Sequence, residues 1–311
     1  MPEKILITGG TGMVGKNILE HPKAQDYEIL HPSSKELNLL SKEQVKEYLT
    51  KYHPDVIIHA AGLVGGIQAN MANPVGFLVQ NLDMARNLIG VAYELKIPKL
   101  LNIASSCMYP RRAANPLKES MILTGELEPT NEGYALAKIF GTRLCEYISK
   151  EDTQLSYKTL IPCNLYGKFD KFDPKNSHML PAVIRKIDQA VQQQNNEVEI
   201  WGDGESRREF MYSEDLADFI FYAMPRFEKL PQNLNVGLGF DYSINEYYAT
   251  IAKILGYKGG FKHDLSKPVG MKRKLIDNSA LKNFGWQAKT SLEEGILKTY
   301  QYYKTLENDK L

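Results

Sequence analysis

The sequence predicts an α/β protein built on a doubly wound parallel sheet, and three observations support this. Strand-like and helix-like segments alternate along the first 165 residues, the first strand-like run opens into a glycine-rich turn, and that turn leads into a helix-like stretch. Strands connected in this way lie parallel, and ligands bind beyond their carboxyl ends. Functional residues are therefore expected where strands end.

The first predicted strand is the apolar and β-branched run Lys4–Thr8, and it ends in a glycine-rich turn. Glycine allows a tight turn and a close approach to a pyrophosphate, while the helix that follows, through Val14 and Leu19, offers free N–H groups to the anion. A turn without a ligand is the alternative, but the strand before it and the helix after it favour a dinucleotide site. The expected cofactor contacts here are Gly9, Gly12, Met13, Val14 and Gly15.

The second predicted strand, Glu28–His31, ends without the acidic residue that binds a ribose 2′-hydroxyl. Without that carboxylate a 2′-phosphate would not be repelled, and Ser34 and Lys35 in the next turn could bind it. NADP is therefore favoured over NAD. His31 and Lys35 could equally be solvated loop residues.

The alternation continues with strands predicted at 55–59, 99–105 and 157–161 and helices at 75–95 and 133–149. The ends of these strands should converge on one crevice with the glycine turn. They supply further candidate residues for this crevice. The expected cofactor contacts among them are Ala60, Ala61, Gly62, Pro162 and Asn164, and Ser105 and Cys107 follow another strand.

After residue 165 the pattern loosens, with helices expected near 178–194, 213–224, 243–255 and 290–304. We predict a dinucleotide-binding domain over 1–165, to which 213–236 returns, and a mainly C-terminal substrate lobe over 166–311. The length of 311 residues permits this division.

The composition excludes several classes of protein. The net charge of +1 gives no reason to expect nucleic acid or a membrane surface as partner, and no apolar run approaches the ~18 residues of a spanning helix. There is no secretory h-region at the N-terminus, so a cytoplasmic location is expected. Cys107, Cys145 and Cys163 have unrelated spacings, which predict neither a disulfide framework nor a metal site.

Tyr134 and Lys138 are four residues apart in a predicted helix, so their side chains share a face. A nearby ammonium should lower the pKa of the phenol and suit it to proton exchange with a carbonyl oxygen. Ser105, at a strand end, could donate a second hydrogen bond to that oxygen. With 18 tyrosines present, an ordinary helical tyrosine is the alternative for Tyr134 alone, but the combination favours catalysis.

These glycines together with Ser105, Tyr134 and Lys138 resemble the extended short-chain dehydrogenase/reductase family over nearly the whole chain. Six segments resemble, more narrowly, the GDP-L-fucose synthase family within it: His59–Gly66, Ser105–Pro110, Asn164–Gly167, Asn176–Pro181, Trp201–Gly204 and Arg208–Phe210. The resemblance implies NADPH, a GDP-linked 4-keto-6-deoxy sugar, and a homodimer through helices near 80–95 and 134–149.

The resemblance also implies roles for individual residues. Cys107 and His178 match the base and acid that invert C3 and C5 of the keto sugar, and His178 also borders the cofactor. The residues that match substrate contacts are Asn164, Leu180, Lys186, Trp201, Arg208 and Lys274. Lys186 stands where some family members have arginine, and the loop Lys168–Pro174 also departs from the family pattern, so the sugar is left open.

Three alternative functions compete with this one. The first is a 4-reductase of a GDP-4-keto hexose or heptose that does not epimerise. The second is a nucleotide-sugar 4-epimerase that holds NAD. The third is a non-catalytic NADP-binding regulator, against which the intact Ser105, Tyr134 and Lys138 argue.

Overall fold

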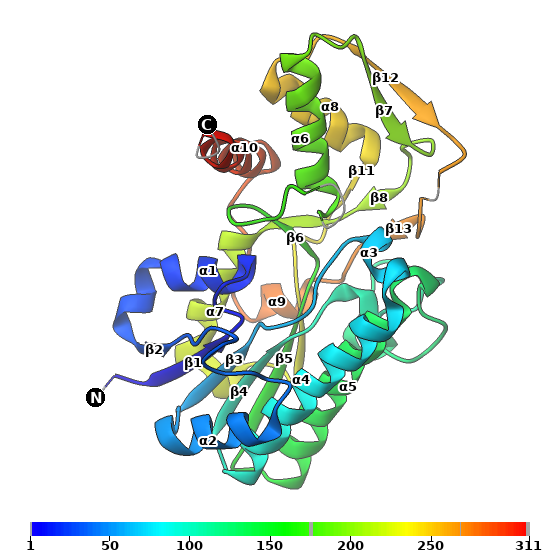
Figure 1. The fold of residues 1–311 in the computed structure, drawn as a ribbon. Coiled ribbons are helices and arrows are strands. Elements are labelled where there is room, and N and C mark those ends of the chain that lie inside the picture. The colour runs from blue at the N-terminus through cyan, green and yellow to red at the C-terminus, as the bar shows by residue number, and fades with distance from the viewer. Residues whose placement is uncertain (1, 174–176, 268, 309–311) are drawn as a thin grey trace.

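A six-stranded parallel sheet forms the centre of the computed structural model, which describes residues 2–173, 177–267 and 269–308 (Figure 1). Its strand order is β10-β5-β4-β3-β1-β2, with every neighbouring pair parallel. The strands are β1 (Lys4–Thr8), β2 (Glu28–Leu30), β3 (Val56–His59), β4 (Lys99–Ile103), β5 (Ser156–Pro162) and β10 (Asn233–Val236). The predicted doubly wound sheet is confirmed.

Helices cover both faces of this sheet, and together with it they form what we call the sheet lobe. Helices α1 and α7 pack together, as do α4 with α5 and α2 with α4. The helices are α1 (Met13–Glu20), α2 (Lys42–Tyr52), α3 (Ile67–Ala72), α4 (Pro74–Glu94), α5 (Glu132–Glu151), α7 (Ser213–Ala223) and α9 (Ser279–Asn283). Helices α2 and α3 have no counterpart among the predicted elements, since α2 buries only Val45 and Leu49 among charged neighbours.

A second lobe lies beyond the carboxyl ends of the strands (Figure 1). It contains a three-stranded sheet of order β11-β8-β13, the parallel pair β7 and β12, and three packed helices. Its elements, with the parallel pair β6 and β9 at its base, are β6 (Asn164–Tyr166), α6 (Met179–Gln192), β7 (Glu197–Trp201), β8 (Arg207–Arg208), β9 (Phe210–Tyr212), β11 (Tyr242–Ser243), α8 (Ile244–Leu255), β12 (Gly260–Asp264), β13 (Arg273–Lys274) and α10 (Leu292–Asn308).

Each layer has its own apolar core. Successive residues of β1 face opposite sides of the sheet, so Ile5 and Ile7 pack with Phe219 of α7, whereas Leu6 packs with Leu88 of α4. A third cluster fills the second lobe and includes Leu180, Ile184, Tyr247, Ile251 and Tyr303. All these side chains are buried, so both lobes are rigid enough to hold residues at their junction.

Short 3₁₀ turns occupy several connections, at Pro22–Asp26, Ser106–Met108, Glu119–Met121, Pro129–Asn131 and Met224–Lys229. The turn at 106–108 directly follows Ser105 after β4, so it places Cys107 beyond a strand end. Within the described part of the chain, none of the helices has the length and apolarity needed to cross a membrane.

Candidate active site

The glycine turn after β1 forms a cradle in which Gly9 and Gly15 leave no room for a side chain. Gly9 has φ +76°, and a Cβ on it would stand 2.7 Å from the Cα of Ala61 after β3. A Cβ on Gly15 would collide with the carbonyl oxygen of Gly9. Helix α1 begins after Gly12 without a side-chain cap, so its first N–H groups can bind an anion. The predicted glycines and Ala61 therefore fit the pyrophosphate of a dinucleotide.

The turn after β2 does contain a carboxylate, which the sequence argument left out. Glu36 Oε2 accepts hydrogen bonds from the backbone N–H and the hydroxyl of Ser33, each at 2.8 Å. These two hydrogen bonds lower the pKa of Glu36, and the bond from the backbone has the larger effect. Ser34 and Lys35 are exposed and make no part of this contact. Glu36 is thus turned back on its own loop, and the two predicted phosphate-binding residues stay accessible.

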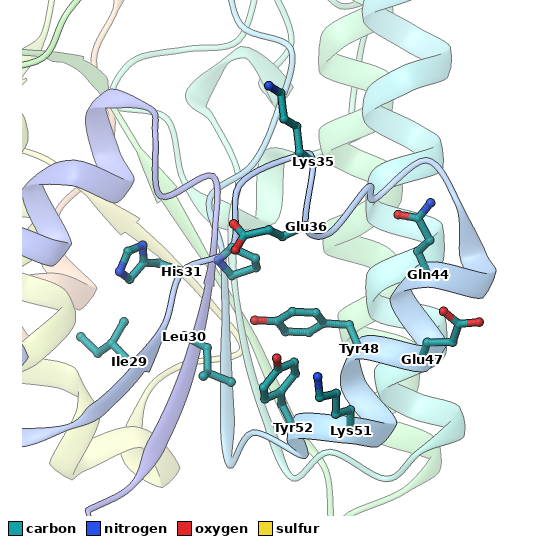
Figure 2. A pocket seen from close by; sticks show the side chains of 11 residues that line it. Ile29, Leu30, His31, Lys35, Glu36, Gln44, Glu47, Tyr48, Lys51 and Tyr52 are labelled. Atoms are coloured by element: carbon teal, nitrogen blue, oxygen red, sulfur yellow. The ribbon is translucent and has the colours of Figure 1, made fainter.

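Beside this turn lies an open depression of about 820 Å³ between β2 and α2. Figure 2 shows His31 and Glu36 on the strand side and Tyr48 and Tyr52 on the helix side, with Lys35 extending away from the tyrosines. The two tyrosine rings are 4.4 Å apart between centroids. The depression borders the predicted 2′-phosphate site and leaves room for a bulky group there.

Lys138 lies near the ends of β3 and β4. Its Nζ donates to the carbonyl oxygen of Ile103 at 2.9 Å and lies 5.6 Å from the ring centroid of Tyr134. Burial lowers the pKa of Lys138 to about 8. The pKa of His59 is lowered to about 3, first by burial and second by the same ammonium. The ring of His59 is hydrogen-bonded to Thr8 at 2.9 Å. His59 is therefore a neutral structural residue between β1 and β3.

The expected lowering of the phenol pKa is wrong for this structure. The pKa of Tyr134 is raised, chiefly by burial and secondly by Cys107. Burial is the physical reason, and the ammonium of Lys138, which faces the ring and donates to a carbonyl oxygen, does not offset it. Tyr134 is consequently protonated at neutral pH, the state that a proton donor requires.

Ser105 and Cys107 are adjacent to this pair. The hydroxyl oxygen of Ser105 accepts from the backbone N–H of Cys107 at 3.3 Å. Burial raises the pKa of the Cys107 thiol, while Ser105 and the ammonium groups of Lys274 and Lys138 oppose that rise. Cys107 is thus subject to the charge of one lysine from each lobe.

His178 precedes α6 and does not cap that helix with its side chain. Burial lowers its pKa, and the charges of Lys274 and Lys171 lower it further. Lys274 therefore acts electrostatically on both His178 and Cys107. The structure brings together five of the predicted residues, Ser105, Cys107, Tyr134, Lys138 and Lys274. His178 is related to this group through the electrostatic effect of Lys274 on it.

Two of the predicted substrate residues face each other across neighbouring strands. Lys274 of β13 is the register partner of Arg208 of β8. Burial lowers the pKa of Lys274, and the positive charge of Arg208 lowers it further. The Arg208 guanidinium donates to the carbonyl oxygens of Arg207 at 2.8 Å and Val269 at 3.0 Å. Asn164 Nδ2 donates to the carbonyl oxygen of Glu209 at 2.8 Å. These residues form a positively charged junction between the lobes.

The remaining predicted substrate residues lie elsewhere in the second lobe. Lys186 donates to the carbonyl oxygen of Glu199, and Trp201 Nε1 donates to the Glu199 carboxylate at 2.9 Å. Trp201 is 40% exposed, so its ring can receive a flat group. Leu180 is fully buried in the core of the second lobe. Pro174 and Asn176 lie outside the described residues.

One supporting residue was missed by sequence reasoning. Asn81 of α4 exchanges hydrogen bonds with the backbone of Leu63, accepting at 2.8 Å and donating at 3.1 Å. This fixes the turn after Gly62, where a Cβ would stand 3.1 Å from Asn81 Oδ1 and 3.7 Å from Lys138 Nζ. A buried asparagine on the inner face of the 75–95 helix was the signal that could have revealed it.

The fold and the site together define a Rossmann-type enzyme of the dehydrogenase/reductase class. The model of the NAD dependent epimerase/dehydratase family matches residues 5–237. The chain belongs to this family, as the resemblance to extended short-chain dehydrogenases/reductases predicted.

Individual relatives cover almost the whole chain. It is 63% identical to the GDP-L-colitose synthase of Yersinia pseudotuberculosis, over 98% of this chain and 99% of that one. It is 39% identical to the GDP-L-fucose synthase of Escherichia coli, over 98% and 97%. Among solved structures, a GDP-6-OMe-4-keto-L-xylo-heptose reductase from C. jejuni superposes with a TM-score of 0.91, 30% identity and 98% coverage of both chains. The GDP-mannoheptose C4 reductase of Campylobacter jejuni, solved with NADP bound, gives 0.88 and 30%, over 97% and 98%.

Proposed function

We propose that this protein uses NADPH to reduce the C4 keto group of a GDP-linked 4-keto-6-deoxy sugar, after inverting C3 and C5. The observation that supports it best is the surroundings of Cys107, because the ammonium groups of Lys274 and Lys138 both favour its thiolate. Tyr134 and Lys138 also interact electrostatically with Cys107. One site thus contains the groups for proton abstraction, proton return and carbonyl reduction.

The cofactor is NADP(H), as it is in the solved reductase with NADP bound. The cradle of Gly9, Gly12 and Gly15 would hold its pyrophosphate, and Ser34 and Lys35 would bind the 2′-phosphate. The residues proposed for the rest of the cofactor are Met13, Val14, Ala60, Ala61, Gly62, Tyr134, Lys138, Pro162, Asn164 and His178. When bound, NADPH supplies the hydride.

Epimerisation requires a base on one face of the sugar and an acid on the other. A C4 keto group acidifies the protons on C3 and C5, because the carbanion delocalises onto oxygen as an enolate. Cys107 must act as thiolate, and the ammonium groups of Lys274 and Lys138 favour that form against burial. His178 returns the proton, while Ser105 and Tyr134 donate hydrogen bonds to the enolate oxygen.

Reduction requires a proton for the oxygen on C4. Tyr134 carries that proton at neutral pH, because burial raises its pKa. Lys138 stabilises the phenolate that remains, since an ammonium favours a nearby anion. Arg208 and Lys274 bind the diphosphate, with Asn164 beside them. Trp201 and Lys186 belong to the nucleotide pocket, and Leu180 supports it from the core of the second lobe.

Reduction without epimerisation is the second candidate. The two Campylobacter reductases named above support it, because their names specify reduction of GDP-linked heptoses. The colitose-forming relative adds a second hexose to consider besides fucose. The proposal of a 6-deoxy hexose rests on the synthases and that of a heptose on the reductases.

A homodimer in the cytoplasm completes the proposal. Apolar side chains are exposed along the neighbouring helices α4 and α5, where Val75 is 71%, Val79 46%, Leu136 41% and Tyr147 64% exposed. Burying such a face between two copies would remove apolar area from water. Equilibrium sedimentation of the wild type beside Val79→Glu tests this, and a wild-type monomer would refute it.

The test of function is to incubate the purified protein with NADPH and a panel of GDP- and UDP-linked 4-keto sugars in D₂O. We expect NADPH oxidation only with GDP-linked sugars, and deuterium at C3 and C5 of the product. Reduction without label would establish the plain reductase. If the wild type oxidised NADPH with none of the sugars, and Tyr134→Phe behaved identically, the non-catalytic regulator would be the remaining candidate.

A further inference from the structure

Glu209 occupies the point where four segments that cross between the two lobes meet. It belongs to one of them, between β8 and β9, and the others are 162–164 after β5, 236–239 after β10, and 274–276 after β13. Figure 1 shows β6, β8 and β13 on the side of the second lobe that faces the sheet lobe.

The side chain and backbone of Glu209 bond to all three other crossings. Oε1 accepts from the N–H groups of Leu238 at 2.6 Å and Gly239 at 2.9 Å, and Oε2 accepts from the N–H of Ile276 at 3.0 Å. Its backbone carbonyl oxygen accepts from Asn164 Nδ2 at 2.8 Å. One residue therefore fixes the relative positions of the four segments.

A carboxylate suits this position better than a glutamine amide does. Glu209 is fully buried, with both oxygens used as acceptors from backbone donors. Burial raises its pKa to about 7, and these backbone hydrogen bonds oppose the rise. Glutamine would keep one acceptor but turn an NH₂ group toward a backbone N–H.

The crossings carry the anion-binding groups of the proposed substrate site. Arg208 precedes Glu209, Lys274 is two residues before Ile276, and Asn164 bonds to Glu209 itself. We propose that Glu209 is a positioning residue that holds Arg208, Lys274 and Asn164 of the junction in register with Cys107 and Tyr134 of the sheet lobe. This inference rests on the proposed GDP-sugar site.

The test uses two separate variants, Glu209→Gln and Gly237→Ala. The second of them leaves every charge in place. A Cβ on Gly237 would stand 2.5 Å from Glu209 Oε1, so it would displace the carboxylate from Leu238 and Gly239. In both variants we expect faster amide hydrogen exchange at 237–239 and 275–277. We also expect GDP to bind at least tenfold more weakly, with NADP⁺ affinity within twofold of wild type.

Asp188→Asn is the matched control, because Asp188 is a buried carboxylate whose partners, Tyr300 and Lys304, lie within the second lobe. It should lower Tm without changing GDP affinity. A folded Glu209→Gln or Gly237→Ala protein with wild-type GDP affinity would overturn the inference, and so would unchanged exchange at the crossings. A wild type that binds NADP⁺ but not GDP would instead refute the proposed function, and the exchange measurement would still test Glu209.

Discussion

The ammonium of Lys138 lies 5.6 Å from the ring centroid of Tyr134 and donates to the Ile103 carbonyl oxygen at 2.9 Å. Sequence spacing placed these two side chains on one face of a helix, and they are indeed neighbours. Their orientation differs from the expected one, since the ammonium faces the ring. Lys138 can therefore serve the site as a buried positive charge, while Tyr134 keeps its proton.

The pKa of Lys138 predicts the pH dependence of the enzyme. Burial lowers this pKa to about 8, so the ammonium is present below that pH and lost above it. We expect kcat/KM for the keto sugar to fall about tenfold per pH unit above about 8. In Lys138→Arg the alkaline decline should disappear, because a guanidinium does not deprotonate there.

Lys274→Ala is the control for this profile, because Lys274 also has a lowered pKa. It should retain the decline near pH 8. If the decline vanished in Lys274→Ala and persisted in Lys138→Arg, the titrating group would be Lys274.

Tyr134→Phe tests the proton donor. Removing the hydroxyl should lower kcat by about 10²–10⁴-fold, the usual contribution of a general acid. NADPH and GDP affinities should stay within about threefold, because the ring and its edge contact with Phe77 remain. Stopped-flow absorbance of NADPH measures the reduction step. Unchanged single-turnover reduction would remove Tyr134 from the mechanism.

Local patterns in the sequence predicted the sheet and the glycine cradle because both depend on short-range features. Strand β1, Gly9 and α1 follow one another within 20 residues, so their geometry is set by neighbours in the chain. The convergence of Cys107 with Lys274 came from family resemblance, since nothing local relates residues so far apart.

Side-chain orientation and burial could not be predicted from the sequence. The turn of Glu36 onto Ser33 and the burial that raises the Tyr134 pKa depend on tertiary packing. The role of Glu209 depends on four segments from distant parts of the chain. Such relations cannot be obtained from spacing alone.

Cys107→Ser separates epimerisation from reduction. Serine keeps the size and a hydrogen-bonding group, but its hydroxyl is far less acidic than a thiol, so proton abstraction should slow at least 100-fold. Reduction of a keto sugar that is already epimerised should change less than about threefold, because Tyr134 remains. Deuterium uptake at C3 and C5, measured by NMR in D₂O, reports the first step. Equal loss of both steps would contradict the assignment of Cys107 as base.

Lys274→Ala tests the junction between the lobes as an anion site. Lys274 stands beside Arg208 across two strands, and their combined charge suits a diphosphate. A hydrogen bond to a charged group contributes about 1.5–3 kcal/mol, so KM for the GDP-sugar should rise by roughly 10- to 100-fold. Lys272→Ala removes an exposed lysine two residues earlier and should leave KM unchanged. Because Lys274 also favours the Cys107 thiolate, deuterium uptake in this variant should slow at saturating substrate, whereas reduction of an epimerised sugar should not. A collapse of the reduction kcat with KM unchanged would show that Lys274 acts on the reduction itself and does not bind the diphosphate.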